Sequence, residues 1–262
     1  MRILLTNDDG LMAPGIRALW EALQGLGEIL VVAPQEVQSA TSHGITFHEP
    51  LLTQDVQVTE RMRGIAVEGR PADCVKLALR AIWQEKYGAG TLPDVTISGM
   101  NAGANVGINV IYSGTVAAAV ESAFLGVPAI AVSLYLGDRE HIHFKRAAQM
   151  ARAAIDRVLQ HTIDKHSVIN INIPIVEHDD APMPAIKVVE MNSGAGTDGY
   201  ERRVSPWGRV YYWSNGDGME FSHTSSGSDV EALNAGHITI TPLSYELTDF
   251  SRMEKWRKNL ST

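Results

Sequence analysis

The chain has 262 residues, of which 45% are hydrophobic and 20% are charged, and this balance is typical of a folded globular protein. Its length predicts one domain with added elements, because single α/β domains often reach this size. The net charge of -8 comes without a basic half or tail, which excludes a protein that grips a nucleic-acid polymer. Cys74 is the only cysteine, which excludes a disulfide framework and a cysteine-based metal site.

The sequence has no segment that suits a signal peptide or a membrane span. The apolar run near the N-terminus covers residues 3–5 and soon meets Asn7 and Asp8, which is too short for secretion. The most hydrophobic later stretch, residues 123–136, contains Gly126 and falls well below the length that spans a bilayer. We therefore expect a soluble cytoplasmic protein with no membrane partner.

The N-terminal part of the chain predicts a strand, a helix and a second strand. Residues 2–6 form a short apolar strand, and Pro14 suits the first turn of a helix with Ile16 and Leu19 on one face. Residues 28–33 form the next apolar strand and complete a βαβ unit with parallel strands. Short strands between about residues 44 and 68, and a helix over 71–86, are expected to follow.

Strands and helices continue to alternate, and the pattern changes past about residue 185. The alternating part predicts strands at 94–98, 128–134 and 168–173 and helices at 115–125 and 143–161. The later part predicts a β-rich segment at Val210–Trp213, a turn over 215–218, a short helix opened by Ser228 and Glu231, a strand at 237–241 and an amphipathic terminal helix around Phe250, Met253 and Trp256. This pattern indicates a single α/β domain over residues 1–262, with a doubly wound, mostly parallel, Rossmann-like sheet and a C-terminal hairpin and helix extension over about 185–262.

Oxygen-bearing side chains follow the predicted strands, where open α/β sheets bind their ligands. Asp8 and Asp9 come directly after the first strand, Ser39 follows the second, and Asn101 follows the strand at 94–98. Adjacent carboxylates repel each other unless a cation or hydrogen-bond donors offset them. Mg²⁺ or Mn²⁺ prefers such an all-oxygen set, so these residues predict a divalent metal site. The alternative is that Asp8 or Asp9 only caps the following helix.

A glycine- and asparagine-rich segment over residues 98–115 is the second functional feature. It contains Asn101 and Asn105 and ends in Ser113, Gly114 and Thr115 at the start of an Ala-rich helix. Backbone N–H groups and small hydroxyls at a helix N-terminus favour a phosphate. The alternative is a plain connection in which Ser113 or Thr115 is the N-cap. The segment has neither the P-loop pattern nor the dinucleotide fingerprint.

Three other features are weaker functional candidates. His43 lies in a loop after a predicted strand and could touch a substrate, although a solvated loop histidine fits equally well. Cys74 lies in an apolar helix, which favours a small buried residue over a nucleophile. The aromatic residues of the hairpin region suit cross-strand packing or a subunit interface better than base stacking; they are Trp207, Tyr211, Tyr212 and Trp213.

Several of these motifs, taken in order along the chain, resemble the SurE family of stationary-phase survival proteins. They are MRILLTNDDG, Ser39 after VVAP, GRPADCVKLAL, SGMNAGANVG, YSGTVAAAVE and ITPL. The resemblance implies a metal-dependent 5'/3'-nucleotidase and phosphatase. It implies that one divalent cation is bound by Asp8, Asp9, Ser39 and Asn101, and that Ser113, Gly114 and Thr115, together with Asn105, meet the substrate phosphate. It also implies that the C-terminal hairpin and helix serve oligomer formation.

We therefore predict a phosphomonoesterase that acts on nucleoside 5'-monophosphates, and also on 3'-monophosphates and short polyphosphate. It would use one Mg²⁺ or Mn²⁺ per subunit, with Asp8 and Asp9 as the catalytic residues, and would form a homodimer or homotetramer. The attacking group, a metal-bound water or a carboxylate, stays open at this point. A nucleotide- or phosphate-binding regulatory module without turnover is the alternative function, and an assembly protein built around its C-terminal arm is the third.

Overall fold

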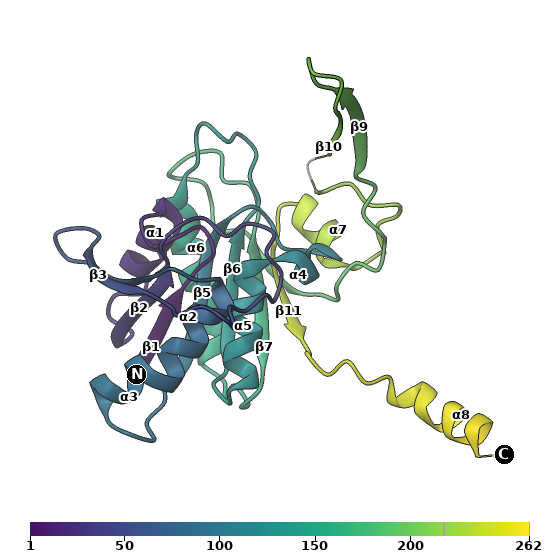
Figure 1. Ribbon diagram of the computed structural model, residues 1–262. Helices are drawn as coiled ribbons and strands as arrows, with labels where there is room; N and C mark the ends of the chain where they lie inside the picture. The colour runs from purple at the N-terminus through teal and green to yellow at the C-terminus, as the bar shows by residue number, and fades with distance from the viewer. Residues whose placement is uncertain (217, 262) are drawn as a thin grey trace.

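The computed structural model describes residues 1–216 and 218–261, and its centre is a nine-stranded sheet (Figure 1). The strand order is β3-β4-β2-β1-β5-β6-β7-β11-β8. The sheet is parallel except where β3 meets β4 and β11 meets β7, which confirms the doubly wound, mostly parallel prediction. Its strands are β1 (Arg2–Thr6), β2 (Glu28–Pro34), β3 (Thr53–Gln57), β4 (Arg63–Val67), β5 (Val95–Ala102), β6 (Ala129–Leu134), β7 (Val168–Ile173), β8 (Ile186–Val188) and β11 (Ile238–Leu243).

The strand order reverses between β1 and β5. From β1 the chain passes to β2 on one side, and it later returns to place β5 on the other side of β1. Leu5 of β1 is thereby paired with Val31 of β2 and with Ile97 of β5, all in parallel register. The carboxyl ends of β1 and β5 therefore lie side by side at the switch point, where open sheets leave a crevice for ligands.

Helices cover both faces of the sheet. On one face α1 (Pro14–Ala22) packs against α6 (Phe144–Leu159), and on the other α2 (Pro71–Leu77) packs against α5 (Gly114–Phe124). The helix predicted over 71–86 is one helical segment that runs from α2 through a π-helical stretch, η1 (Ala78–Ile82), into α3 (Trp83–Tyr87). A single turn of helix, α4 (Asn109–Tyr112), precedes α5.

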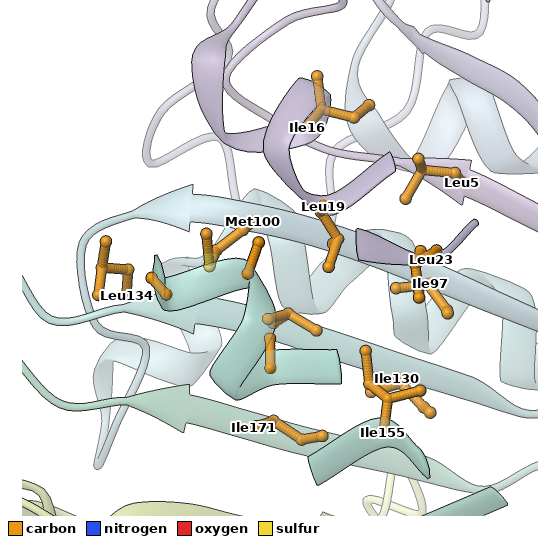
Figure 2. Close-up of a cluster of buried hydrophobic side chains, with 14 of the residues drawn as sticks. Leu5, Ile16, Leu19, Leu23, Ile97, Met100, Ile130, Leu134, Ile155 and Ile171 are labelled. Carbon is orange, nitrogen blue, oxygen red and sulfur yellow. The ribbon is translucent and has the colours of Figure 1, made fainter. Parts of the chain in front are cut away.

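The largest hydrophobic cluster lies between the sheet and the α1–α6 layer, as Figure 2 shows. Leu5 and Ile97 of the central strands meet Leu19 of α1 and Ile155 of α6, and all four side chains are fully buried. A second cluster on the opposite face includes Trp83. Burying each of these side chains contributes about 1.5–3 kcal/mol, so the two layers hold the strand ends in fixed positions.

The C-terminal extension has a hairpin, a short helix and a final helix. The hairpin pairs β9 (Gly199–Val204) with β10 (Val210–Asn215), and its turn lies over residues 205–209, where Ser205 N donates to Arg209 O at 2.8 Å. The turn predicted over 215–218 includes Asp217, which lies outside the described residues. Helix α7 (Asp229–Asn234) is capped by Ser228, as expected. The hairpin and α8 (Phe250–Leu260) both project from the body (Figure 1).

Within the described ranges, no helix combines the length and the apolar character that a membrane crossing requires.

Replacing Leu19 by alanine is expected to lower the free energy of unfolding by about 2–5 kcal/mol, because the change leaves a cavity in the main core. Chemical denaturation of Leu19→Ala measures this loss. Leu52→Ala is the matched control, since Leu52 is 56% exposed, and its unfolding free energy is expected to stay within about 0.5 kcal/mol of the parent value. Equal losses in the two variants would contradict the packing described.

Candidate functional site

A cavity of about 480 Å³ opens at the carboxyl ends of β1, β5 and β6. It lies at the switch point of the sheet, as the strand-end argument requires. Gly114 and Thr115 do not line it but lie behind Asp8. The predicted site residues that the structure brings together around this cavity are Asp8, Asp9, Ser39, Asn101, Asn105 and Ser113.

Asp8 is held against the first turn of α5. Its side chain is buried, and its Oδ1 accepts a hydrogen bond of 2.5 Å from the Thr115 hydroxyl. The backbone N–H of Thr115 also faces this carboxylate. A Cβ on Gly114 would lie 2.8 Å from the Asp8 Cβ, so glycine is required for the helix to approach so closely. Thr115 therefore orients Asp8, a role that its position in the phosphate-binding pattern did not suggest.

Asp9 and Asn101 come from neighbouring strand ends. Asp9 Oδ2 accepts a hydrogen bond of 3.0 Å from the Ala102 backbone N–H, which ties the end of β1 to the end of β5. The Asn101 side chain donates from Nδ2 to Gly103 O at 2.7 Å. Its Oδ1 accepts no hydrogen bond within the described part of the chain, and it is the atom that a cation would use. The helix-capping alternative is wrong for both aspartates, since α1 is preceded by Ala13 and has no side-chain cap.

Ser39 reaches the site on a loop that is pinned at both ends. Gln38 N donates to Asp8 O at 2.8 Å, and Ser42 N donates to Tyr112 O at 3.1 Å. These bonds fix the loop between the end of β1 and α4. Ser39 itself is exposed on the cavity wall, where its hydroxyl can bind a ligand.

The two carboxylates lie together without a basic partner. Among the described residues, no lysine, arginine or histidine forms an ion pair with Asp8 or Asp9. Burial is the main cause that raises the pKa of Asp8 to about 6. The hydrogen bond from the Thr115 hydroxyl lowers this pKa, and the negative charge of Asp9 raises it. Burial also raises the pKa of Asp9. The site therefore favours a positive group that would offset this charge.

The donor set fits a hard divalent cation. It consists of carboxylate, hydroxyl and amide oxygens, which Mg²⁺ and Mn²⁺ prefer over softer ligands. Across residues 1–216 and 218–261, no group of three or more His, Cys, Asp or Glu side chains could hold a metal ion. A cation here would thus depend on the neutral oxygens of Ser39 and Asn101 as well as on the aspartates.

Asn105 is fixed by a buried polar network that the sequence pattern did not reveal. Its backbone N–H donates to Asn172 Oδ1 at 2.8 Å, and its carbonyl accepts from Asn170 Nδ2 at 2.8 Å. Its own Nδ2 donates to Ser133 Oγ at 2.8 Å. The only signal in the sequence was the pair of asparagines inside the apolar strand VININI. The network holds the segment after β5 in place against β6 and β7.

Ser113 is the N-cap of α5, which is one of the two N-cap positions that the sequence suggested. Its Oγ accepts a hydrogen bond of 3.1 Å from Val116 N, while the residue still lines the cavity. The N–H groups of the first turn of a helix have no partner inside the helix and carry the positive end of its dipole. Phosphate contact by Ser113, Gly114, Thr115 and Asn105 stays a prediction.

His43 and Cys74 lie outside this cavity. His43 Nε2 is 2.8 Å from Glu121 Oε2, in a groove along α5 rather than beside Asp8. Cys74 is fully buried in α2, which confirms the interpretation of a small core residue.

Residues 3–196 match the family model described as survival protein SurE. The chain belongs to the SurE family. It is 39% identical to the 5'-nucleotidase SurE of Carboxydothermus hydrogenoformans over 99% of this chain and 97% of that protein. It is 41% identical to the 5'-nucleotidase SurE of Rhodopirellula baltica over 98% of each. The crystal structure of the SurE protein from Aquifex aeolicus has a TM-score of 0.82 at 35% identity and covers 99% of both chains. The family resemblance of the sequence is thereby confirmed.

Cys74 is expected to react with an aromatic disulfide reagent at least ~100-fold more slowly in the native protein than in the unfolded one. Burial, and next the charge of Asp73, raise the pKa of the thiol well above its ordinary value, and the thiolate is the reactive form. The released chromophore measures both rates. Ser226→Cys, on an exposed turn, is the control and should react rapidly in the native state. Rapid native labelling of Cys74 would contradict its burial.

Proposed function

We propose that this SurE-family chain is a metal-dependent phosphomonoesterase that hydrolyses nucleoside monophosphates to nucleoside and phosphate. The observation that best supports this proposal is the pair of carboxylates, Asp8 and Asp9, that lie beside the N-terminus of α5 at the switch point of the sheet. Among the described residues, no basic side chain forms an ion pair with either of them. A cation and a phosphate fit this arrangement together, because the positive charge of the cation offsets the negative charge of both the carboxylates and the phosphate. The activity for which the relatives are named, 5'-nucleotidase, supports the same reaction class.

One Mg²⁺ or Mn²⁺ per chain would be held by Asp8, Asp9, Ser39 and Asn101. When bound, it supplies positive charge that neutralises the transferred phosphoryl group. The residues of the chain do the positioning. Thr115 and Ala102 fix the two carboxylates, and Ser113, which opens α5 and lines the cavity, would meet the remaining phosphate oxygens at the positive end of the helix dipole.

The purified protein is expected to release phosphate from nucleoside 5'-monophosphates with Mg²⁺ or Mn²⁺ and to lose this activity in excess chelator. Asp8→Asn and Asp9→Asn are each expected to lower kcat/KM by ~100-fold or more, because each removes a charged ligand. A phosphate assay with the 5' and 3' isomers and short polyphosphate measures the rates and the preference.

Asp164→Asn is the matched control for these variants, since Asp164 is exposed and precedes β7, at the amino ends of the parallel strands and away from the cavity. Circular dichroism and the unfolding midpoint show whether each variant is folded. Full activity in folded Asp8→Asn or Asp9→Asn protein would overturn the metal-site proposal. Tight calorimetric binding of a nucleotide without phosphate release would favour a regulatory binding module instead.

We propose further that two or four copies assemble through the C-terminal segment. Helix α8 has no buried residue, and its Phe250 and Trp256 are 60% and 59% exposed. A mostly apolar groove of about 950 Å³ lies along α5, where Val120 and Phe124 face Leu243 near the end of β11. Exposed apolar surface of this kind is typical of an interface.

The double variant Phe250→Glu, Trp256→Glu is expected to be monomeric under conditions in which the parent chain is a dimer or tetramer, because charged groups disfavour burial in an interface. Light scattering coupled to gel filtration measures the mass. Phe47→Glu is the control, because Phe47 is 81% exposed but belongs neither to the C-terminal segment nor to the groove. A parent chain that is already monomeric, or an unchanged mass in the double variant, would refute this assembly.

A further inference from the structure

Arg139 is the only basic residue that lines the cavity of Asp8 and Asp9 in the described ranges. It lies on the loop after β6, whereas Asp8 follows β1, and β5 separates these two strands. Neighbouring strands are about 4.8 Å apart, so the two strand ends are separated by roughly 10 Å. Apart from the two aspartates and Arg139, the described residues that line the cavity are neutral. Among the described residues, the cavity thus has its acidic pair, buried Asp8 and partly buried Asp9, at one strand end and a single basic side chain after a strand two places away.

The loop is shaped so that Arg139 stays without a partner. The neighbouring Asp138 accepts a hydrogen bond of 2.8 Å from the Glu140 backbone N–H, and its other oxygen is 2.9 Å from His141 Nδ1. Gly137 packs on the segment after β7, where a Cβ would lie 3.0 Å from the Ile175 side chain. Of the two acidic residues that flank Arg139 in the sequence, Asp138 is therefore engaged within the loop, and Glu140 forms no ion pair with Arg139 in the described part of the chain. Arg139 is exposed, and within the described residues its guanidinium forms no ion pair or hydrogen bond.

We propose that Arg139 is a substrate-binding residue that contacts a second phosphate group and so lowers the KM for those nucleotides that carry one. The inference rests on the proposed function. The reacting phosphate is expected beside the aspartates and the first turn of α5, at the buried end of the cavity. An exposed guanidinium at a more distant strand end suits the part of the substrate that projects outward. Its planar fork binds phosphate through paired hydrogen bonds, and among the described residues no other lining side chain offers a positive charge for that group.

The second phosphate could be attached to a different hydroxyl of the ribose, as in a 3',5'-bisphosphate, or directly to the first phosphate, as in a 5'-diphosphate. Steady-state kinetics with adenosine 3',5'-bisphosphate, adenosine 5'-diphosphate and adenosine 5'-monophosphate distinguish these two sources. In Arg139→Gln, the KM for at least one of the first two is expected to rise about five- to tenfold with kcat unchanged. The KM for the monophosphate should stay within about twofold. Which of the two substrates responds identifies the attachment.

Two further variants separate a contact from a general effect of charge. Arg139→Lys should restore part of the lost affinity, since lysine keeps the charge but not the fork. Arg80→Gln removes an exposed arginine outside the cavity and should change no KM. An equal rise for all three nucleotides would mean that Arg139 binds the reacting phosphate, and unchanged KM values would mean that it binds none. Either result overturns the proposal.

A binding measurement keeps this test separate from the test of catalysis. If the parent chain releases no phosphate, the proposed function fails, and calorimetric titration in Mg²⁺ then examines Arg139 alone. Adenosine 3',5'-bisphosphate or the diphosphate should bind about five- to tenfold more weakly to Arg139→Gln than to the parent chain, and the difference should shrink in high salt. Equal affinities in the two proteins would overturn the proposal.

Discussion

The site depends on one constraint, which is that two adjacent carboxylates, one buried and one partly buried, lie at the end of β1. Asp8 and Asp9 lie at the switch point of the sheet, and no basic side chain pairs with them in the described part of the chain. Charge buried in this way is unfavourable unless hydrogen-bond donors or a cation offset it. The hydroxyl of Thr115 and the backbone of Ala102 meet part of this need. The part of the charge that these donors do not offset is the physical basis for the proposed metal-dependent reaction with an anionic substrate.

The surrounding structure keeps these groups in position from several strands at once. Gly114 lets α5 approach the Asp8 side chain closely, and Gln38 fixes the Ser39 loop to the Asp8 carbonyl. On the other side, Asn170 and Asn172 hold the backbone of Asn105. Such polar contacts are effective only in a rigid frame, which the hydrophobic layers on both faces of the sheet supply. The hydrophobic core thus contributes to the proposed chemistry because it holds the side chains of the site in fixed positions.

Much of the site could be predicted because strand ends in a parallel sheet meet at one edge. The apolar runs located β1, β2 and β5, and the oxygen-bearing residues directly after them were therefore expected together. The partners of those residues could not be predicted in the same way. Thr115 has the same place in the motif whether it binds phosphate or Asp8, and only the packing of α5 on β5 and β6, which brings its first turn to Asp8, shows that its hydroxyl bonds to Asp8. The hairpin turn depended likewise on strand pairing, which placed it at 205–209.

The sequence by itself determined the fold class, the family and the candidate ligands of the proposed metal site, because hydrophobic periodicity and short motifs are local properties. The tertiary structure alone decided which donors hold each carboxylate and which side chains share the cavity. Arg139 illustrates the difference, since nothing near it in the sequence marks it as part of the site. Its place opposite Asp8 arises from the order of strands in the sheet, and that order is fixed by contacts between residues far apart in the chain.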